Sequence, residues 1–95
     1  MDRAGRLPII VRKRTNDKLN DLTRNRFLVP QSMTFFQFLC VLRRKLELDS
    51  SHAIFVFTSK NRLISTTSLV LDVHAREAET DGILYLTYAS ENAFG

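Results

Sequence analysis

Few residues of this 95-residue chain can carry out catalysis or bind a metal ion. The sequence contains one cysteine, Cys40, and two histidines, His52 and His74. A catalytic nucleophile needs a base within hydrogen-bonding distance, and a metal ion needs a set of suitably spaced ligands. Cys40 falls in an apolar segment, where a thiol is usually buried, and the histidines read as surface or boundary residues. The sequence therefore predicts neither an enzyme nor a metal or cofactor site.

Charge is distributed unevenly along the chain. Residues 1–45 contain 11 Lys and Arg against 3 Asp and Glu, a net charge of +8, whereas residues 46–95 contain 3 against 7, a net charge of −4. A basic half can meet nucleic acid, anionic lipid or acidic peptides, or can simply be a solvated face. Basic residues interleaved with aromatic ones are typical of single-strand binders, but the sequence has no RNP-like stretch. A small RNA-binding domain is therefore a minor alternative, and no nucleic-acid partner is expected.

Length and composition favour one small domain. Ninety-five residues, 44% of them hydrophobic, suffice for one modest core. A single cysteine excludes an internal disulfide and suits a reducing compartment. No apolar run approaches the ~20 residues of a membrane span, and no signal segment follows Met1. We expect one cytoplasmic domain over residues 1–89, followed by a flexible tail over residues 90–95.

Hydrophobic patterning predicts the elements that would position a site. Short β-branched runs predict strands at residues 7–13, 26–30, 53–58, 62–65 and 83–89. Helical spacing predicts a long helix from Phe35 and a weaker one over 69–79, the latter capped by Thr66, Thr67 or Ser68. The final strand is apolar on both faces and so belongs in the middle of the sheet. This order predicts an α+β, β-grasp fold: a mixed sheet of about four strands, one long helix and a second short helix.

The long helix is apolar around more of its circumference than one core contact needs. Phe36, Cys40 and Val41 lie off its main stripe. A second apolar surface is therefore expected beside the helix. The apolar residues of this region cannot all be interior in so small a sheet, although each one taken singly is best explained as core: Ile10, Phe27, Leu28, Val29, Pro30, Met33, Phe38, Val41 and Leu42.

The strand at residues 26–30 is expected at an edge of the sheet. It ends in Pro30, which has no N–H and so stops the ladder. The free N–H and C=O groups of such an edge can pair with an extended peptide, whose alternate side chains then enter flanking pockets. Arg24 and Arg26, next to the edge, would attract acidic residues around the peptide's motif. A peptide-binding groove is therefore the leading hypothesis from the residues themselves.

Five blocks of the sequence closely resemble the autophagy ubiquitin-like modifiers, the family of GABARAP and the microtubule-associated-protein light chains. They are RLPIIVRK, RFLVP, QFLCVLRRKLEL, AIFVF and DGILYLTYASENAFG. The resemblance implies a β-grasp domain whose C-terminal glycine, Gly95 here, is joined through its carboxyl to the amine of phosphatidylethanolamine. It implies activating and conjugating enzymes as thioester partners, a deconjugating cysteine protease, and a cytoplasmic protein that becomes anchored on autophagosomal membranes. Glycine puts no side chain beside the reacting carbon, and with nothing after Gly95 prior trimming would be unnecessary.

The resemblance also implies two receptor pockets. Family receptors and adaptors present a Trp/Phe/Tyr-x-x-Leu/Ile/Val peptide to the second strand, and Arg24 and Arg26 match basic residues that meet its acidic flank. The pocket for the aromatic side chain would be formed by Pro8, Ile10, Arg26, Leu28 and Ile83. The pocket for the aliphatic side chain would be formed by Phe27, Val29, Pro30, Met33, Phe38, Val41 and Leu42.

Three features depart from the family pattern. Family members carry two helices before the first strand, whereas this sequence begins almost at that strand, so one wall of the aromatic pocket is expected to be missing. Ile83 stands where Phe is usual, and the segment 59–65 is one residue longer and lacks the usual pair of prolines. A related autophagy modifier, which is conjugated to a lysine of a partner protein, also ends in an aromatic residue and Gly. It lacks the FLVP block and is the first alternative, ahead of the RNA-binding domain.

Overall fold

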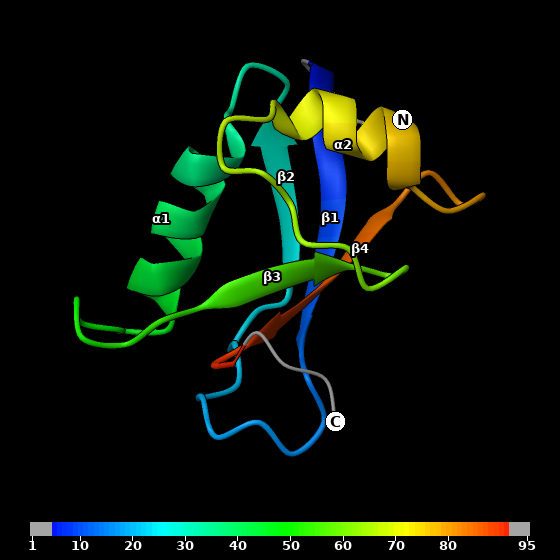
Figure 1. Cartoon of the computed structure of the whole chain (residues 1–95). Coiled ribbons are helices and arrows are strands. Elements are labelled where there is room, and N and C mark those ends of the chain that lie inside the picture. Colours follow the sequence, from blue (N-terminus) through cyan, green and yellow to red (C-terminus); the bar gives the residue numbers. More distant parts are fainter. Residues whose placement is uncertain (1–4, 92–95) are drawn as a thin grey trace.

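The computed structural model describes residues 5–91 and contains a four-stranded mixed sheet with two helices (Figure 1). The elements in chain order are β1 (Arg6–Lys13), β2 (Arg26–Pro30), α1 (Phe35–Lys45), β3 (Phe55–Thr58), α2 (Val70–Glu77) and β4 (Leu84–Ala89). The predicted α+β, ubiquitin-like architecture is confirmed.

The strand order in the sheet is β2-β1-β4-β3, with β1 and β4 parallel and both outer pairs antiparallel. The final strand is therefore interior, as its two apolar faces predict. The strands β2 and β3 form the two edges. The expectation that residues 26–30 lie at an edge is confirmed.

The core lies on one face of the sheet, beneath both helices. On β1, Leu7, Ile9 and Val11 are buried, while Pro8 and Ile10 between them are only half-buried on the opposite, outer face. The buried residues of α1 and α2 pack against the first set: Phe35, Phe38 and Leu42 from α1, and Val70 and Val73 from α2. Among residues 5–91, neither helix covers the outer face, so its apolar residues stay accessible.

The segment between β3 and α2 differs from the prediction. Instead of a strand at 62–65, a single bridge joins Leu63 to Phe57. The chain then runs past the start of α1, where the carbonyls of Thr66 and Ser68 accept hydrogen bonds from its first N–H groups, at 3.0 and 2.8 Å. Residues 66–68 therefore satisfy α1 and do not cap α2, whose N-cap is Leu69, without a side-chain bond.

The predicted burial of Cys40 is wrong, because its side chain is exposed. Successive residues of an α-helix are separated by ~100°, so position 40 lies on the opposite side from Phe38 and Leu42, which are both fully buried. Phe36, four residues earlier on the same side, is 59% exposed. Of the three apolar residues off the stripe, Phe36 and Cys40 are therefore exposed and Val41 is half-buried.

Tyr88 gives the domain a testable alkaline sensitivity. Its buried hydroxyl donates to the carbonyl of Asn20, and burial, with a smaller contribution from Asp21, raises its pKa to about 12. An unfolded tyrosine has a pKa of about 10, so this contribution to stability is complete below pH 10 and is lost as the pH rises through 12. The loss in free energy of unfolding is on the order of 2–3 kcal/mol.

Urea denaturation at several pH values tests this expectation. Tyr88→Phe should lose about 1 kcal/mol near neutral pH with the hydroxyl's bond, and should then decline less steeply between pH 10 and 12 than the parent protein. Parallel profiles for the two proteins would contradict the raised pKa.

Candidate functional site

The free edge of β2 presents backbone groups to solvent. Within the described residues, β2 pairs only with β1 in the sheet. The Val11 N–H donates to the carbonyl of Asn25 at 2.8 Å, and inward-facing positions alternate in an antiparallel pair. The backbone groups of Phe27 and Val29 therefore face β1, and those of Leu28 face away. An extended chain can pair with this edge.

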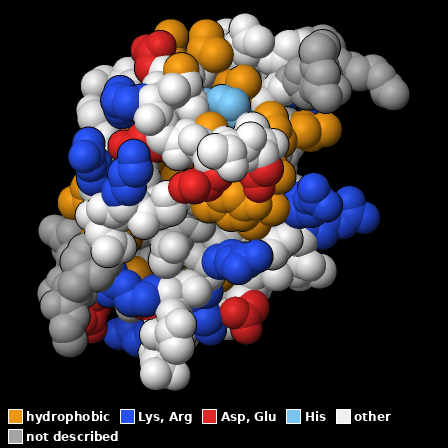
Figure 2. All heavy atoms as spheres, turned by 90° about the vertical axis from the view of Figure 1, so that its right-hand side faces the viewer, with side chains coloured by type: hydrophobic (Ala, Val, Ile, Leu, Met, Phe, Trp, Pro, Cys, Tyr) orange, Lys and Arg blue, Asp and Glu red, His pale blue; other side chains and the backbone are white. Residues whose placement is uncertain are grey.

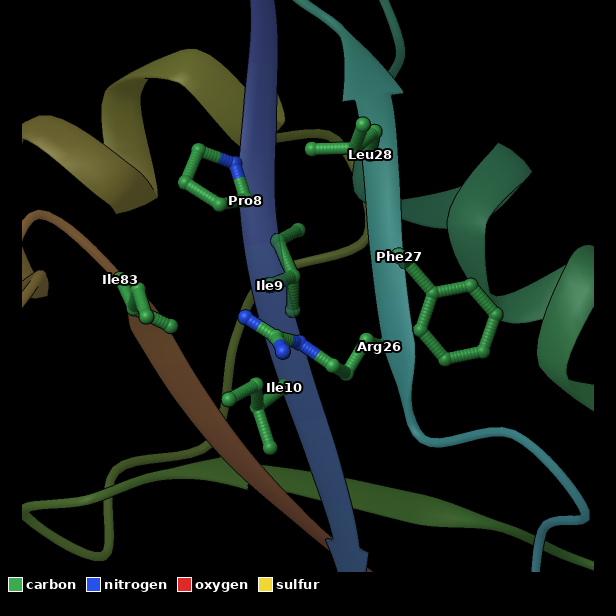
Figure 3. Close-up of a pocket in the computed structure, with 7 residues that line it drawn as sticks. All are labelled: Pro8, Ile9, Ile10, Arg26, Phe27, Leu28 and Ile83. Carbon is green, nitrogen blue, oxygen red and sulfur yellow. The ribbon is translucent and has the colours of Figure 1, made fainter. Parts of the chain in front are cut away.

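A cavity of about 300 Å³ lies on the outer face beside this edge. Its lining brings together all five residues expected for an aromatic pocket, Pro8, Ile10, Arg26, Leu28 and Ile83, and adds Ile9 and Phe27 (Figure 3). The strand register explains the grouping, since Pro8 lies opposite Leu28 and Ile10 opposite Arg26. Ile83 is the residue directly before β4. The arrangement can accept an apolar ring of moderate size.

The cavity has apolar walls and a basic border. Leu28 is 57% exposed, and in Figure 3 the Arg26 side chain extends across β1 toward Ile83. Figure 2 views this side of the molecule and shows a hydrophobic patch with basic side chains beside and below it. Arg24 and Arg26 are both exposed, so their charges can meet an acidic partner.

The residues expected to form the aliphatic pocket divide into two groups. Val29, Phe38 and Leu42 are buried and belong to the core. Phe27, Met33 and Val41 are half-buried, and Pro30 is exposed, so they form the accessible surface above that core. The ring of Phe27 packs edge-on against Phe38, with 5.4 Å between centroids. A ligand on this side would thus touch the surface group, with the core group as its support.

A tyrosine–aspartate pair beside the cavity was missed from the sequence. Tyr85 donates its hydroxyl to Asp81 Oδ2 at 2.6 Å, and Asp81 Oδ1 accepts the Ile83 N–H at 2.9 Å. The bond to Asp81 raises the pKa of Tyr85, and the bond from Tyr85 lowers the pKa of Asp81. The pair holds the turn that positions Ile83. The shared face of Ile83 and Tyr85 on one strand is the signal that could have revealed it.

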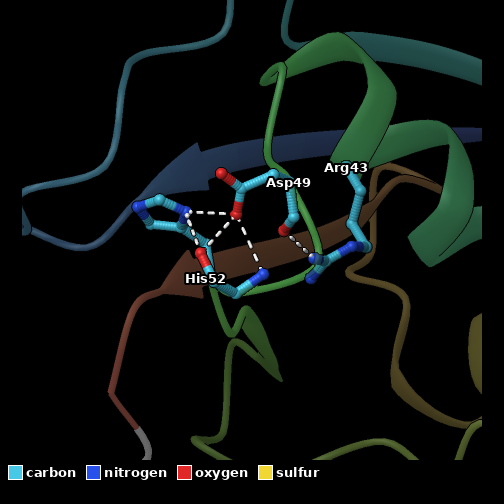
Figure 4. A network of polar contacts seen from close by, with 4 residues as sticks. Arg43, Asp49 and His52 are labelled. Carbon is cyan, nitrogen blue, oxygen red and sulfur yellow. Dashed lines mark hydrogen bonds and ion pairs between the residues drawn. The ribbon is translucent and has the colours of Figure 1, made fainter.

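A second polar cluster lies far from this cavity, in the loop after α1 (Figure 4). Asp49 accepts hydrogen bonds from the Ser51 N–H and from His52 Nδ1, both at 2.9 Å, and Arg43 donates to the Asp49 carbonyl at 2.6 Å. The bonds from Ser51 and His52 hold the pKa of Asp49 well below its usual range.

These residues have the types of a catalytic triad without its geometry. Ser51 Oγ and Asp49 Oδ1 both contact the same ring nitrogen of His52, Nδ1, at 3.4 and 2.9 Å. A triad needs the nucleophile and the carboxylate on opposite ring nitrogens. The cluster therefore acts as a brace for the loop. No three His, Cys, Asp or Glu side chains in the described part of the chain gather as a metal site.

The start of the expected C-terminal tail is tied to the domain. The Ser90 N–H and hydroxyl donate to Asp17 Oδ2 at 2.8 and 3.1 Å, and Asp17 Oδ1 accepts the Leu19 N–H at 3.0 Å. Burial alone would raise the pKa of Asp17, but the bonds from Leu19 and Ser90 outweigh it and lower the pKa. The tether therefore holds at neutral pH. Gly95 and the rest of the expected tail lie outside the described residues.

Replacing Asp17 by Ala should speed hydrogen exchange of the Ser90 amide by about tenfold, because one hydrogen bond of ordinary strength is lost. Exchange measured by NMR on the intact chain checks this. Asp21→Ala is the matched control, since Asp21 lies on the same connection and its carboxylate pairs with Lys13, at 3.4 Å, rather than with Ser90. Equal Ser90 exchange in the two variants would show that Asp17 does not hold the segment.

No helix among residues 5–91 is long and apolar enough to cross a lipid bilayer.

Comparison with known proteins places these features in a family. Residues 2–95 match the family model described as "Autophagy protein Atg8 ubiquitin like". The chain is 38% identical over 92 residues to autophagy-related protein 8B of Oryza sativa subsp. indica, covering 97% of this chain and 76% of that protein. It is 39% identical over 90 residues to autophagy-related protein 8a of Arabidopsis thaliana, covering 95% and 73%. The crystal structure of Trypanosoma brucei ATG8 superposes with a TM-score of 0.87 at 35% identity, covering 98% of this chain and 79% of that one.

Proposed function

The chain belongs to the Atg8 family of ubiquitin-like autophagy proteins, and we propose from this premise that it is a modifier with two working parts. One part is the β2 edge, which receives Trp/Phe/Tyr-x-x-Leu/Ile/Val peptides of cargo receptors and adaptors. The other is Gly95, which is conjugated to phosphatidylethanolamine on forming autophagosomal membranes. Separate enzymes would carry out the covalent steps, and the domain itself would act as a modifier rather than as a catalyst.

The observation that carries the proposal is the cavity of about 300 Å³ beside an open strand edge. A peptide strand beside β2 would pair with the outward backbone groups of Leu28 and place its aromatic side chain over Pro8, Leu28 and Ile83. Backbone pairing supplies affinity without sequence preference, and the cavity supplies the preference. Acidic residues next to the motif would meet Arg24 and Arg26.

The aliphatic side chain of the motif would lie on the opposite side of β2. Side chains three residues apart in a strand point to opposite faces. An aromatic residue on the outer face therefore puts the aliphatic one toward α1, over Phe27, Met33 and Val41. Figure 3 shows Phe27 pointing to that side, away from Pro8 and Leu28. The spacing of the motif fits the two faces of this edge.

The conjugation half of the proposal rests on the family membership and on the C-terminal Gly95. Activating and conjugating enzymes would carry the Gly95 carboxyl as a thioester and transfer it to the lipid amine, and a cysteine protease would reverse the step. The protein would be cytoplasmic until this transfer and membrane-anchored after it. The match to the Atg8 model favours the lipid as acceptor over the lysine of a partner protein.

Reconstitution tests the conjugation. Incubation with the activating and conjugating enzymes, ATP and phosphatidylethanolamine liposomes should yield a lipid adduct of the parent chain, seen by mass spectrometry. Gly95→Ala should reduce the adduct to background, because a side chain would stand beside the reacting carbon. Ala53→Gly is the control, because it changes a residue between Ala and Gly at an exposed loop position. This variant should form as much adduct as the parent chain. If Gly95→Ala formed as much adduct as the parent chain, Gly95 would not be the residue that is joined to the lipid.

A further inference from the structure

A second, larger cavity continues the first one along the outer face. Its volume is about 550 Å³, and it shares three lining residues with the first cavity, namely Pro8, Leu28 and Ile83. The remaining lining comes from the start of β1, the residue after β2, α2 and the turn before β4: Arg6, Leu7, Gln31, His74, Asp81 and Gly82. The aromatic side chain of a bound motif would reach only the shared residues, and the part of the second cavity beyond them would stay without an occupant.

Two polar side chains in the lining of the second cavity, His74 and Asp81, already have partners. His74 Nε2 lies 2.8 Å from the Gly82 carbonyl, and both carboxylate oxygens of Asp81 accept hydrogen bonds, from the Ile83 N–H and from Tyr85. Space remains beside Gly82, where a Cβ would meet no atom within 4 Å. The cavity therefore offers apolar contact to a visitor and few new hydrogen bonds.

Strand register sets the distance between the two cavities. The first lies at the pairs Ile10–Arg26 and Pro8–Leu28, and the second lies at Pro8–Leu28 and toward the next pair, Arg6–Pro30. This is one step of two residues, or about 6.6–6.8 Å along a strand. Side chains two residues apart in a bound strand point to the same face with the same spacing.

The order of the two motif pockets fixes the direction of the bound strand. The aromatic pocket lies at residues 26–28 of β2, and the aliphatic surface extends toward Pro30 and Met33. A motif that reads aromatic first and aliphatic three residues later must therefore run parallel to β2. The position two residues after the aromatic one then lies over the second cavity.

We propose that the second cavity receives an apolar side chain located two residues after the aromatic residue of the same partner strand. The inference rests on the proposed function of the β2 edge and adds a third anchor to its motif, aromatic-x-apolar-aliphatic. The expected partner is an acidic segment, because exposed arginines border the two cavities and precede the edge strand: Arg6 at the second cavity, Arg26 at the first, and Arg24 just before β2. The anchor makes the partner's third motif position selective, which backbone pairing alone does not.

Three synthetic peptides with the same acidic flank test the proposal by calorimetry. Their motifs are Trp-Ala-Ala-Leu, Trp-Ala-Leu-Leu and Trp-Leu-Ala-Leu. The second should bind about tenfold more tightly than the first, because it buries one more leucine. The third has the same composition as the second, but its extra leucine points to the other face, so its affinity should stay within about threefold of the first.

NMR amide shifts and one variant test whether the tenfold higher affinity arises at the second cavity. Only the Trp-Ala-Leu-Leu peptide should shift the amides of Gln31, His74 and Gly82, and Gln31→Trp, which fills the second cavity, should remove the tenfold gain while leaving Trp-Ala-Ala-Leu binding unchanged. Equal gains for both leucine positions, or a gain without shifts at these amides, would overturn the third anchor. Failure of all three peptides to bind would instead reject the β2 edge itself, and with it the proposed function.

Discussion

Replacing Leu28 by Asp should weaken binding of an acidic Trp-x-x-Leu peptide by about a hundredfold. Leu28 borders both cavities and loses its apolar contact with the aromatic side chain, while a carboxylate is placed against that ring and near the acidic flank. The fold should survive, because Leu28 is 57% exposed and contributes little to the core. Calorimetric titration of the folded variant measures the effect.

Leu63→Asp is the matched control. Leu63 is 51% exposed, nearly the same as Leu28, but lies at the opposite end of the sheet, where it bridges to Phe57 of β3. The same change there should leave peptide affinity within about twofold of the parent. A loss at Leu63 equal to that at Leu28 would mean that added negative charge, and not the cavity, decides binding.

Replacing Phe38 by Ala should lower the free energy of unfolding by about 3–5 kcal/mol, the usual cost of removing a fully buried aromatic side chain. Phe38 is 0% exposed and contacts Phe27 and Phe35, with ring centroids 5.4 and 6.0 Å apart. Because Phe27 belongs to β2, the loss should also speed amide exchange in β2. Denaturation in urea and NMR exchange measure the two effects.

Phe36→Ala provides the comparison within the same helix. Phe36 is 59% exposed, so its loss should change the free energy of unfolding by less than about 0.5 kcal/mol. A large loss at Phe36, or a small one at Phe38, would contradict the assignment of the core to the sheet side of α1.

The elements were predictable because their signals are local. The spacing of Phe35, Phe38 and Leu42 shows the buried side of α1, and the alternation of Leu7, Ile9 and Val11 shows the buried side of β1. The position of β4 inside the sheet follows from its two apolar faces. By contrast, the use of the carbonyls of residues 66–68 by α1 depends on where two distant segments meet, and no local pattern carries that information.

The sequence predicted which residues gather at the site, but not which of them are buried and which are accessible. The resemblance to the autophagy modifiers grouped Pro8, Leu28 and Ile83, and the register of β1 with β2 then places them around one cavity. Apolar type alone does not separate Val29, in the core, from Pro30, at the surface. The second cavity depends on how the turn at Gly82 sits against β1, which is a property of the folded chain.

Amide exchange in β2 with and without a Trp-x-x-Leu peptide tests the central claim most directly. The backbone groups of Leu28 face away from β1, whereas those of Phe27 and Val29 face it. We predict that the peptide slows exchange at Leu28 strongly and changes it little at Phe27 and Val29, because only the outward group gains a partner. Slowed exchange in β3, at residues 55–58, with none at Leu28 would contradict the account by placing the partner at the other edge of the sheet.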